Sequence, residues 1–346
     1  MNRIPALDGW RGIAIALVLF DHLQAALTGG YVRPWMQTGQ HGVTIFFVLS
    51  GYLITARLLQ EPAGRIDLRS FYIRRFFRLM PVAWAYLALL WITSRISGER
   101  WISGGEIASC VFFVRNFFGA GPSLYAAHFW SLSIEEQFYL FWPCLLLMAG
   151  MRASRWLALT GAFIIAAYRA IHWAHYDHQW LGFQTQVRAD ALLIGCLLAL
   201  LLAEPRLRLI AQRCGKFLWL PALIALLFAI ASFHWLPPLF ECIAIAVLIA
   251  ASILHAHSLF VRPLLFPALL WMGTISYSVY VWQQFFFVYR GAAITIPLLC
   301  LMPVFALGSY YWIELPSARL GQRIAGRLTS KQSRDHSTYA SAVRSA

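Results

Sequence analysis

Residues 12–23 read GIAIALVLFDHL, an apolar run that carries two ionisable side chains, Asp21 and His22. Arg11 precedes this run and lies eleven positions before His22. At about 1.5 Å of rise per residue, His22 is roughly 16 Å further along a helix than Arg11, near the middle of a bilayer. Ionisable groups at that depth are costly and usually face a wet or buried functional cavity. The segment therefore predicts catalysis or proton movement at His22.

The composition predicts an integral membrane protein. Of the 346 residues, 60% are hydrophobic and only 12% are charged, about half the charged fraction of a soluble domain. We expect one integral-membrane domain over residues 1–325 and a polar, disordered tail over residues 326–346. The first apolar run is long enough to span and lacks a cleavage pattern, so it does not resemble a signal peptide. Six cysteines lie in or beside apolar segments without CxxC spacing, so we interpret them as core residues and expect no metal site.

The fold expected is all-α, a polytopic membrane helix bundle. About ten apolar segments have the length of a spanning helix: 10–28, 42–60, 79–95, 133–151, 156–173, 188–203, 217–233, 238–255, 267–288 and 292–312. The stretch 101–131 has an apolar core that is too short to cross and is interrupted by Arg115 and Asn116. We therefore expect a re-entrant or interfacial segment there.

The distribution of charge predicts the orientation. With the N-terminus in the cytoplasm, 21 of the 28 Lys and Arg residues lie in cytoplasmic loops, helix ends or the tail. Excess Lys and Arg belongs on that side, so both termini are expected to be cytoplasmic. Membrane topology and anionic lipid then account for the net charge of +14, and no nucleic-acid partner is needed.

One basic cluster exceeds what topology requires. Residues 69–81 read RSFYIRRFFRLMP, in which Arg74 and Arg78 share a helix face and Arg75 lies beside them. Two interpretations remain open at this point. The segment is either an amphipathic helix on anionic lipid or a phosphate clamp built from the planar forks of arginine.

A second polar group enters an apolar helix at residues 128–139, HFWSLSIEEQFY. Glu135 and Glu136 are adjacent, so their side chains point about 100° apart on a helix. Ser131 or Ser133 could form a capping box with one of them. The other would be free to face a cavity, where a carboxylate near His22 would fix its tautomer and raise its basicity.

A third polar group opens the segment at residues 188–203. Arg188 and Asp190 could pair with each other or with groups that line a cavity. Nearby aromatic residues, Trp130 among them, could line a sugar-binding mouth, although aromatic side chains also belt membrane proteins at the interface.

Several of these motifs, taken together, resemble the membrane-bound acyltransferase 3 family of bacteria. The resemblance rests on Arg11 and His22 with ten residues between them, FFVLSGY at 46–52, RRFFR at 74–78, WSLSIEEQFY at 130–139, RAD at 188–190 and SYSVYVW at 276–282. It covers the chain to about residue 320. One departure is that some members have a histidine after the tryptophan of the ninth span, where this chain has Gln283 and Gln284. Some members also carry an extracytoplasmic hydrolase-like domain, for which we expect no room here.

The resemblance implies an inner-membrane enzyme that moves an acyl group, commonly acetyl, from coenzyme A to a hydroxyl. The acceptor would be a surface glycan, a lipid-linked sugar or a secondary metabolite. Acyl-CoA would be a co-substrate, and no tightly bound cofactor is expected. The expected site residues are His22 and Glu136 for catalysis; Arg11, Arg74, Arg75 and Arg78 for the donor; and Glu135, Trp130, Ser131, Arg188 and Asp190 for the cavity.

The mechanistic hypothesis makes His22 a general base that Glu136 orients, with an acyl-His22 intermediate as the other route. A proton-coupled transporter or flippase with His22, Asp21 and Glu136 as a proton relay is the alternative from a different class. Donor dependence discriminates the two, because a transporter has no use for acyl-CoA. The sequence identifies neither the acceptor nor the oligomeric state.

Overall fold

The computed structural model describes residues 3–28, 38–60, 67–118, 123–173, 183–232, 238–288 and 292–328. Every regular element in these ranges is helical, which confirms the all-α prediction. The α-helices are α1 (Pro5–Leu27), α2 (Gly39–Leu58), α3 (Leu68–Ile96), α4 (Gly104–Val111), α5 (Phe129–Trp173), α7 (Thr185–Leu202), α8 (Pro205–Ser232), α9 (Pro238–Leu254), α10 (Pro267–Phe286) and α11 (Ala292–Ser309). Short 3₁₀ helices lie at Arg115–Phe117, Leu124–Ala126 and Leu259–Leu265, and a π-helical turn lies at Tyr310–Glu314.

The number of spans is not confirmed at ten. Six helices of the described residues are long and apolar enough to cross a membrane, or seven if α9 and the 3₁₀ helix after it form one bent span. Two structural features account for part of the difference from the predicted count, and α10 is the other predicted span that is not among the six. The 17-residue α9 bends by 94° into its neighbour. The range of α5 holds two predicted spans, which are separated by a break at Gly150, where φ is 71°. Residues 119–122 of the predicted re-entrant stretch, and 329–346 of the predicted tail, lie outside the described residues.

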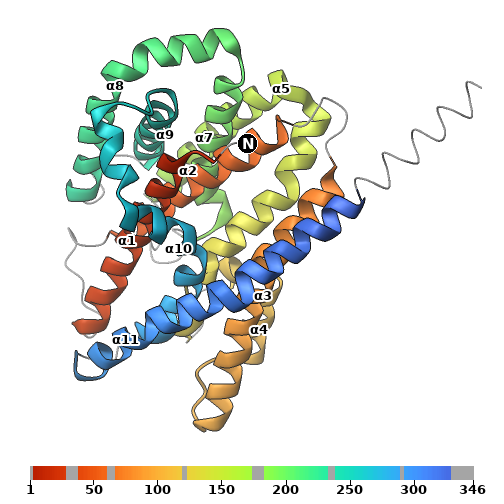
Figure 1. Cartoon of the computed structure of the whole chain (residues 1–346), viewed down its shortest axis with the longest axis vertical. Coiled ribbons are helices and arrows are strands. Elements are labelled where there is room, and N and C mark those ends of the chain that lie inside the picture. Colours follow the sequence, from red (N-terminus) through yellow and green to blue (C-terminus); the bar gives the residue numbers. More distant parts are fainter. Residues whose placement is uncertain are drawn as a thin grey trace, which may run out of the picture.

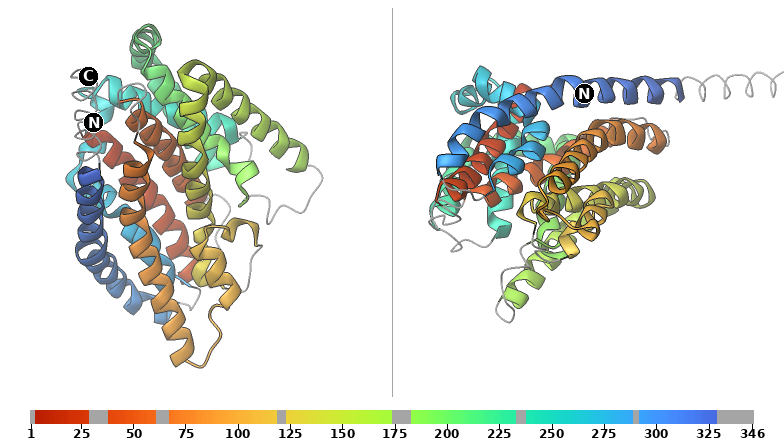
Figure 2. Two further views of the ribbon diagram at one scale, coloured as in Figure 1. Left: turned by 90° about the vertical axis from the view of Figure 1, so that its right-hand side faces the viewer. Right: turned by 90° about the horizontal axis from the view of Figure 1, so that it is seen from below.

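The apolar surface fits a bilayer environment. Large hydrophobic side chains point outward from several helices, including Met148, Phe217 and Trp312, which are 85%, 71% and 82% exposed. A water-soluble protein rarely exposes so much contiguous apolar surface. Helix α11 runs along the periphery in both views of Figure 2, and its helical course continues past the π turn to Leu328. The chain is therefore a multi-pass membrane protein.

Two helix pairs at the centre approach each other very closely. A Cβ atom added to Gly12 would lie 2.3 Å from the carbonyl oxygen of Leu269, and one added to Gly273 would lie 1.8 Å from that of Asp8. These contacts join α1 to α10, which lie side by side in Figure 1. Gly51 and Gly195 make the same kind of contact between α2 and α7, at 2.0 and 2.1 Å. Small residues at these crossings let the backbones meet, as is typical of helices in lipid.

We predict that Gly273→Ala destabilises the protein, because its methyl group would have to displace the backbone of α1. Overpacking of this kind costs about 1–3 kcal/mol. The matched control is Gly105→Ala on α4, where an added Cβ meets nothing within 4 Å. Thermal unfolding of the purified protein in detergent checks the pair. Equal midpoints for the two variants would contradict the close-packing argument.

Candidate active site

Three hollows form a row through the bundle and share walls. The arginine pocket opens at the surface and is lined by six arginines, namely Arg3, Arg11, Arg57, Arg74, Arg75 and Arg78. The central cavity, about 230 Å³, shares Arg11, Arg57, Arg75 and Arg78 with that pocket and adds Glu135, Tyr139 and Ser131. The histidine cavity, about 290 Å³, contains Asp21, His22 and Trp130 and shares only Val43 and Tyr280 with the central cavity.

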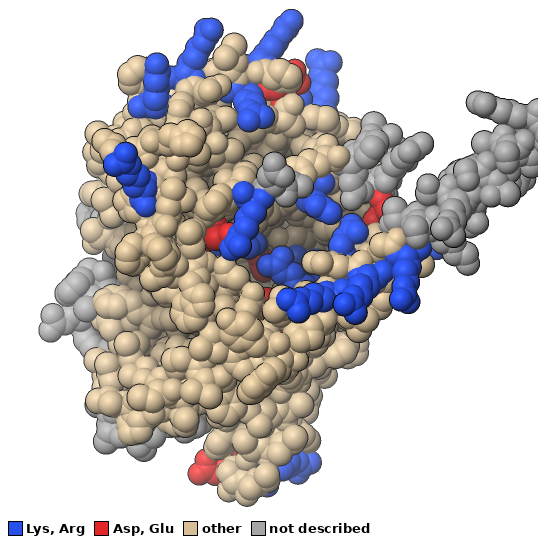
Figure 3. All heavy atoms as spheres, viewed as in Figure 1, with Lys and Arg blue, Asp and Glu red and all other residues tan. Residues whose placement is uncertain are grey.

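The arginine pocket is strongly positive. Its only carboxylate among the described lining residues is Asp8, which accepts from Arg3 at 2.7 Å and lies 3.7 Å from Arg11. Figure 3 draws one face of the molecule and shows Lys and Arg side chains gathered around a hollow near its middle. The sequence predicted a helix for Arg74, Arg75 and Arg78, ahead of a span that begins at residue 79. In the structure these arginines and the span form one continuous helix, α3, which Asp67 caps by accepting from the Ser70 amide at 3.2 Å.

Arg75 is held by a pair of partners on α5. It donates to Glu136 from Nη2 at 2.5 Å and from Nε at 3.1 and 3.2 Å, and its guanidinium lies 3.0 Å from the centre of the Tyr139 ring. This geometry differs from the hypothesis in which Glu136 orients His22, because Glu136 is committed to Arg75. Arg78 lines both the arginine pocket and the central cavity, and it has no ion-pair partner among the described residues.

Glu135 faces the central cavity, as one of the two adjacent carboxylates was expected to do. Its carboxylate accepts from the Ser50 hydroxyl, and the Tyr139 hydroxyl donates to the Ser50 carbonyl at 3.2 Å. The capping-box interpretation is wrong. Helix α5 begins at Phe129, so Ser133 lies inside the helix and donates to the Phe129 carbonyl at 2.8 Å.

His22 contacts Gln283. Its Nδ1 lies 2.6 Å from Oε1 of Gln283, whose side chain is fully buried on α10. Asp21 lines the same cavity from the same helix. In the sequence analysis Gln283 stood out only because some family members have a histidine at this position. Two adjacent amide side chains in an apolar helix were the sequence signal that could have identified it.

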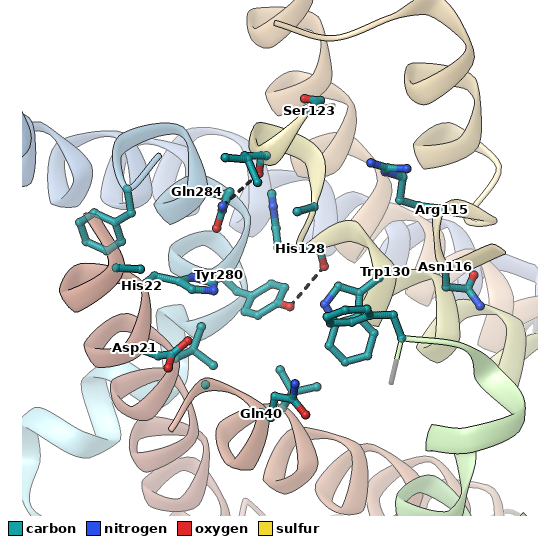
Figure 4. Close-up of a pocket in the computed structure, with 18 of the residues that line it drawn as sticks. Asp21, His22, Gln40, Arg115, Asn116, Ser123, His128, Trp130, Tyr280 and Gln284 are labelled. Atoms are coloured by element: carbon teal, nitrogen blue, oxygen red, sulfur yellow. Dashed lines mark hydrogen bonds between the residues drawn. The ribbon is translucent and has the colours of Figure 1, made fainter. Parts of the chain in front are cut away.

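Tyr280 separates the two inner hollows. Its hydroxyl lies 2.5 Å from the Ser131 hydroxyl and donates to the His128 carbonyl at 3.2 Å, which closes the space between α10 and the start of α5. Figure 4 shows the Tyr280 ring beside His22, with its hydroxyl pointing away from His22 and toward the His128 carbonyl. Arg11 and His22, eleven residues apart on one helix, thus face hollows on opposite sides of Tyr280.

The far wall of the histidine cavity is aromatic and polar. The rings of Trp130 and Phe183 meet with centroids 5.0 Å apart, and Arg188 lies over Trp130 at 5.6 Å. Asp190 does not pair with Arg188, because it accepts from Arg169 at 2.7 Å. Arg188 contacts Trp130 and the Gln40 carbonyl, and both of these residues line the cavity, so the second interpretation holds for Arg188. It does not hold for Asp190, because Arg169 is not among the described lining residues.

The carboxylate of Glu106 binds two residues that line this cavity, Arg115 and Ser123. Glu106 on α4 accepts from the backbone and hydroxyl of Ser103 at 3.0 and 2.9 Å, from the Ser123 amide at 3.2 Å and from Arg115 at 3.4 Å. Burial alone would raise the pKa of Glu106, but the hydrogen bonds from Ser103 and Ser123 and the charge of Arg115 lower it below its ordinary value. The carboxylate therefore stays ionised and keeps Arg115 and Ser123 at the rim of the cavity.

Comparison with known proteins identifies the family. The family model described as "Acyltransferase domain" matches residues 4–313. The chain belongs to this acyltransferase family.

Curated relatives match the same region. The chain is 33% identical over 315 residues to "Putative O-acetyltransferase SACOL0978" of Staphylococcus aureus (strain COL). The matched region covers 82% of this chain and 50% of that protein. It is 30% identical over 312 residues to "Peptidoglycan O-acetyltransferase OatA" of Listeria monocytogenes, covering 81% of this chain and 49% of that protein. The chain thus spans about half the length of the curated relatives it matches. No solved structure was found to match.

In this acyltransferase domain, we predict that Glu136→Ala lowers stability because it leaves the Arg75 guanidinium buried and unpaired. Breaking a buried pair from one side typically costs about 3–5 kcal/mol. The double variant Arg75→Met, Glu136→Leu removes both charges and should lose less than Glu136→Ala alone. Thermal unfolding of the three proteins checks this order. A double variant less stable than the single variant would show that the pair is not the source of the loss.

Proposed function

We propose that this acyltransferase domain moves an acyl group, in the simplest case acetyl, from acyl-CoA to a hydroxyl of a carbohydrate acceptor. The names of the relatives support O-acetyl transfer. The row of three hollows is the structural observation that carries the proposal, because it links a positive surface pocket to a histidine inside the bundle. We further propose that the protein resides in the bacterial inner membrane with the arginine pocket facing the cytoplasm, the side that the positive-inside rule favours.

The arginine pocket is the proposed site for the phosphates of the donor. Arginine binds phosphate through two parallel hydrogen bonds, which makes it the preferred residue for such groups. Arg11 and Arg78 line both the pocket and the central cavity, so they are suited to meet a ligand that enters from the surface. We assign Arg75 a different part, since its contacts with Glu136 and Tyr139 fix the position of α3 against α5. The pantetheine arm would then extend into the central cavity.

His22 is the proposed general base. It takes the proton of the acceptor hydroxyl, whose oxygen bonds to the acyl carbon while the carbon–sulfur bond breaks. The coenzyme A thiolate leaves and receives the proton from the imidazolium. General-base assistance of this kind is typically worth about 10² to 10⁴ in rate. Because His22 faces the hollow beyond Tyr280, the acyl group has to pass this side chain to reach the acceptor.

The histidine cavity is the proposed acceptor site. Trp130 and Phe183 offer apolar ring faces, while Gln40 and Gln184 offer amides that can bind hydroxyl groups. Such a combination suits a sugar, and a peptidoglycan O-acetyltransferase among the relatives favours a cell-wall glycan or its lipid-linked precursor.

Acetyl-CoA binding and turnover test the proposal, with full-length protein in lipid nanodiscs. We predict that Arg78→Ala raises the Kd for acetyl-CoA about 10-fold or more, because a charged hydrogen bond contributes about 1.5–3 kcal/mol. His22→Ala should keep the wild-type Kd and lose about 10² or more in thioester turnover. Arg213→Ala, an exposed arginine on α8, is the matched control and should change neither quantity.

Two results would overturn the proposal. Unchanged acetyl-CoA binding in Arg78→Ala, with wild-type turnover in His22→Ala, would remove both residues from the reaction. Absence of acetyl-CoA binding, together with solute uptake that follows a proton gradient in proteoliposomes, would establish the transporter alternative instead.

A further inference from the structure

We infer that Gln283 is the positioning residue that selects the reactive tautomer of His22, through a one-way chain of amide hydrogen bonds that ends at the backbone of Leu124. The catalytic consequence of this inference rests on the proposed function, whereas the tautomer itself can be measured without it.

The direction of the chain is fixed at its far end, where the backbone carbonyl of Leu124 can only accept. The carbonyl oxygen of Leu124 receives a hydrogen bond from Nε2 of Gln284 at 3.0 Å, so the amide of Gln284 presents its NH₂ group to Leu124 and its oxygen to the other side. Figure 4 shows Gln284 joined by this bond at the rim of the histidine cavity.

The next two links follow from that first one. Oε1 of Gln284 accepts from Nε2 of Gln283 at 3.5 Å, the longest contact in the chain. With its NH₂ group turned to Gln284, Gln283 points its oxygen at Nδ1 of His22, 2.6 Å away. An amide oxygen has no proton to give, so Nδ1 carries the hydrogen and donates it. Nε2 of His22 is then left with a free lone pair, as a general base requires.

The packing of the two helices keeps this contact in place. His22 is on α1 and Gln283 is on α10, the two helices whose backbones touch at Gly12 and Gly273. Gln283 is fully buried, so its amide has little freedom to rotate away. A neutral amide also fixes the tautomer without placing another charge inside the membrane, where a carboxylate in the same position would be costly.

The other titratable groups near His22 are limited. Among the described residues that line the cavity, these are Asp21 on α1, His128 before α5, Arg115 and Tyr280. Among the described residues no hydrogen bond joins any of them to the imidazole, although Asp21 and His128 interact with it electrostatically. The Tyr280 hydroxyl is engaged with Ser131 and His128. Gln283 is therefore the residue whose change should alter the imidazole most directly.

Nitrogen-15 NMR of the full-length protein, labelled at histidine and held in nanodiscs, reads the tautomer directly. The signal of His22 is assigned as the one lost in His22→Ala. We expect the Nδ1–H tautomer in the wild type and a mixture of tautomers in Gln283→Met, which keeps the size of the side chain and removes the acceptor. Gln40→Met, which lines the same cavity without contacting His22, is the control and should leave the signal unchanged.

The pH profile of acyl transfer provides the second readout. In Gln283→Met we expect kcat to fall about 10-fold or more, with unchanged acetyl-CoA affinity. In Gln283→Glu a carboxylate partner would stabilise the protonated imidazole, so we expect the acidic limb of the profile to move to higher pH. A role limited to helix packing would lower activity without moving that limb.

Each outcome bears on the inference. An Nε2–H tautomer in the wild type, or the same tautomer in wild type and Gln283→Met, would overturn it. An Nδ1–H tautomer that is lost in Gln283→Met would support it even if the wild type transferred no acyl group, in which case the proposed function would fail and the positioning of His22 by Gln283 would stand.

Discussion

The close approach of α1 to α10 is the constraint on which the rest of the site depends. Lipid gives two helices no hydrophobic reason to associate, so van der Waals contact between backbones has to supply much of the attraction. Gly12 and Gly273 permit that contact, and any side chain there would collide with a carbonyl group. The same contact aligns the two helices along their length, which is why His22 and Gln283 meet near the other end of the pair.

The ion pair between Arg75 and Glu136 is a second contact that holds the helices together. Both side chains are largely buried, so each charge would be expensive without the other. The pair joins α3 to α5 and cancels one positive charge at the edge of the arginine pocket. Arg11 and Arg78 keep their charges directed at the hollows. The proposed anion site and the ion pair that joins α3 to α5 are thus built from neighbouring residues of one motif.

The sequence predicted the features that depend on local pattern. Hydropathy was sufficient for the all-helical membrane fold and for the interruption near Gly150, because an apolar run and its break are encoded by adjacent residues. Arg11 and His22 are both partly buried and line different hollows, as two side chains eleven residues apart on one helix can do. Contacts between distant helices were harder to predict. Nothing in the pattern around Glu136 distinguishes Arg75 from His22 as its partner, since both lie far away in the chain, and the amide of Gln283 carries no charge to reveal it.

Tyr280 sets the remaining physical requirement on the proposed reaction. It closes the path between the central cavity and the histidine cavity through hydrogen bonds to Ser131 and to the His128 carbonyl. A typical hydrogen bond contributes about 0.5–1.5 kcal/mol net, so breaking both would cost on the order of 1–3 kcal/mol. Thermal motion can supply this, and the binding energy of a donor could do so readily. In the proposed reaction, hydrolysis of the thioester would compete with transfer, so limiting the entry of water from the histidine cavity would favour the acceptor. Tyr280 lies between the two cavities, and its contacts are weak enough to break during a reaction of this kind.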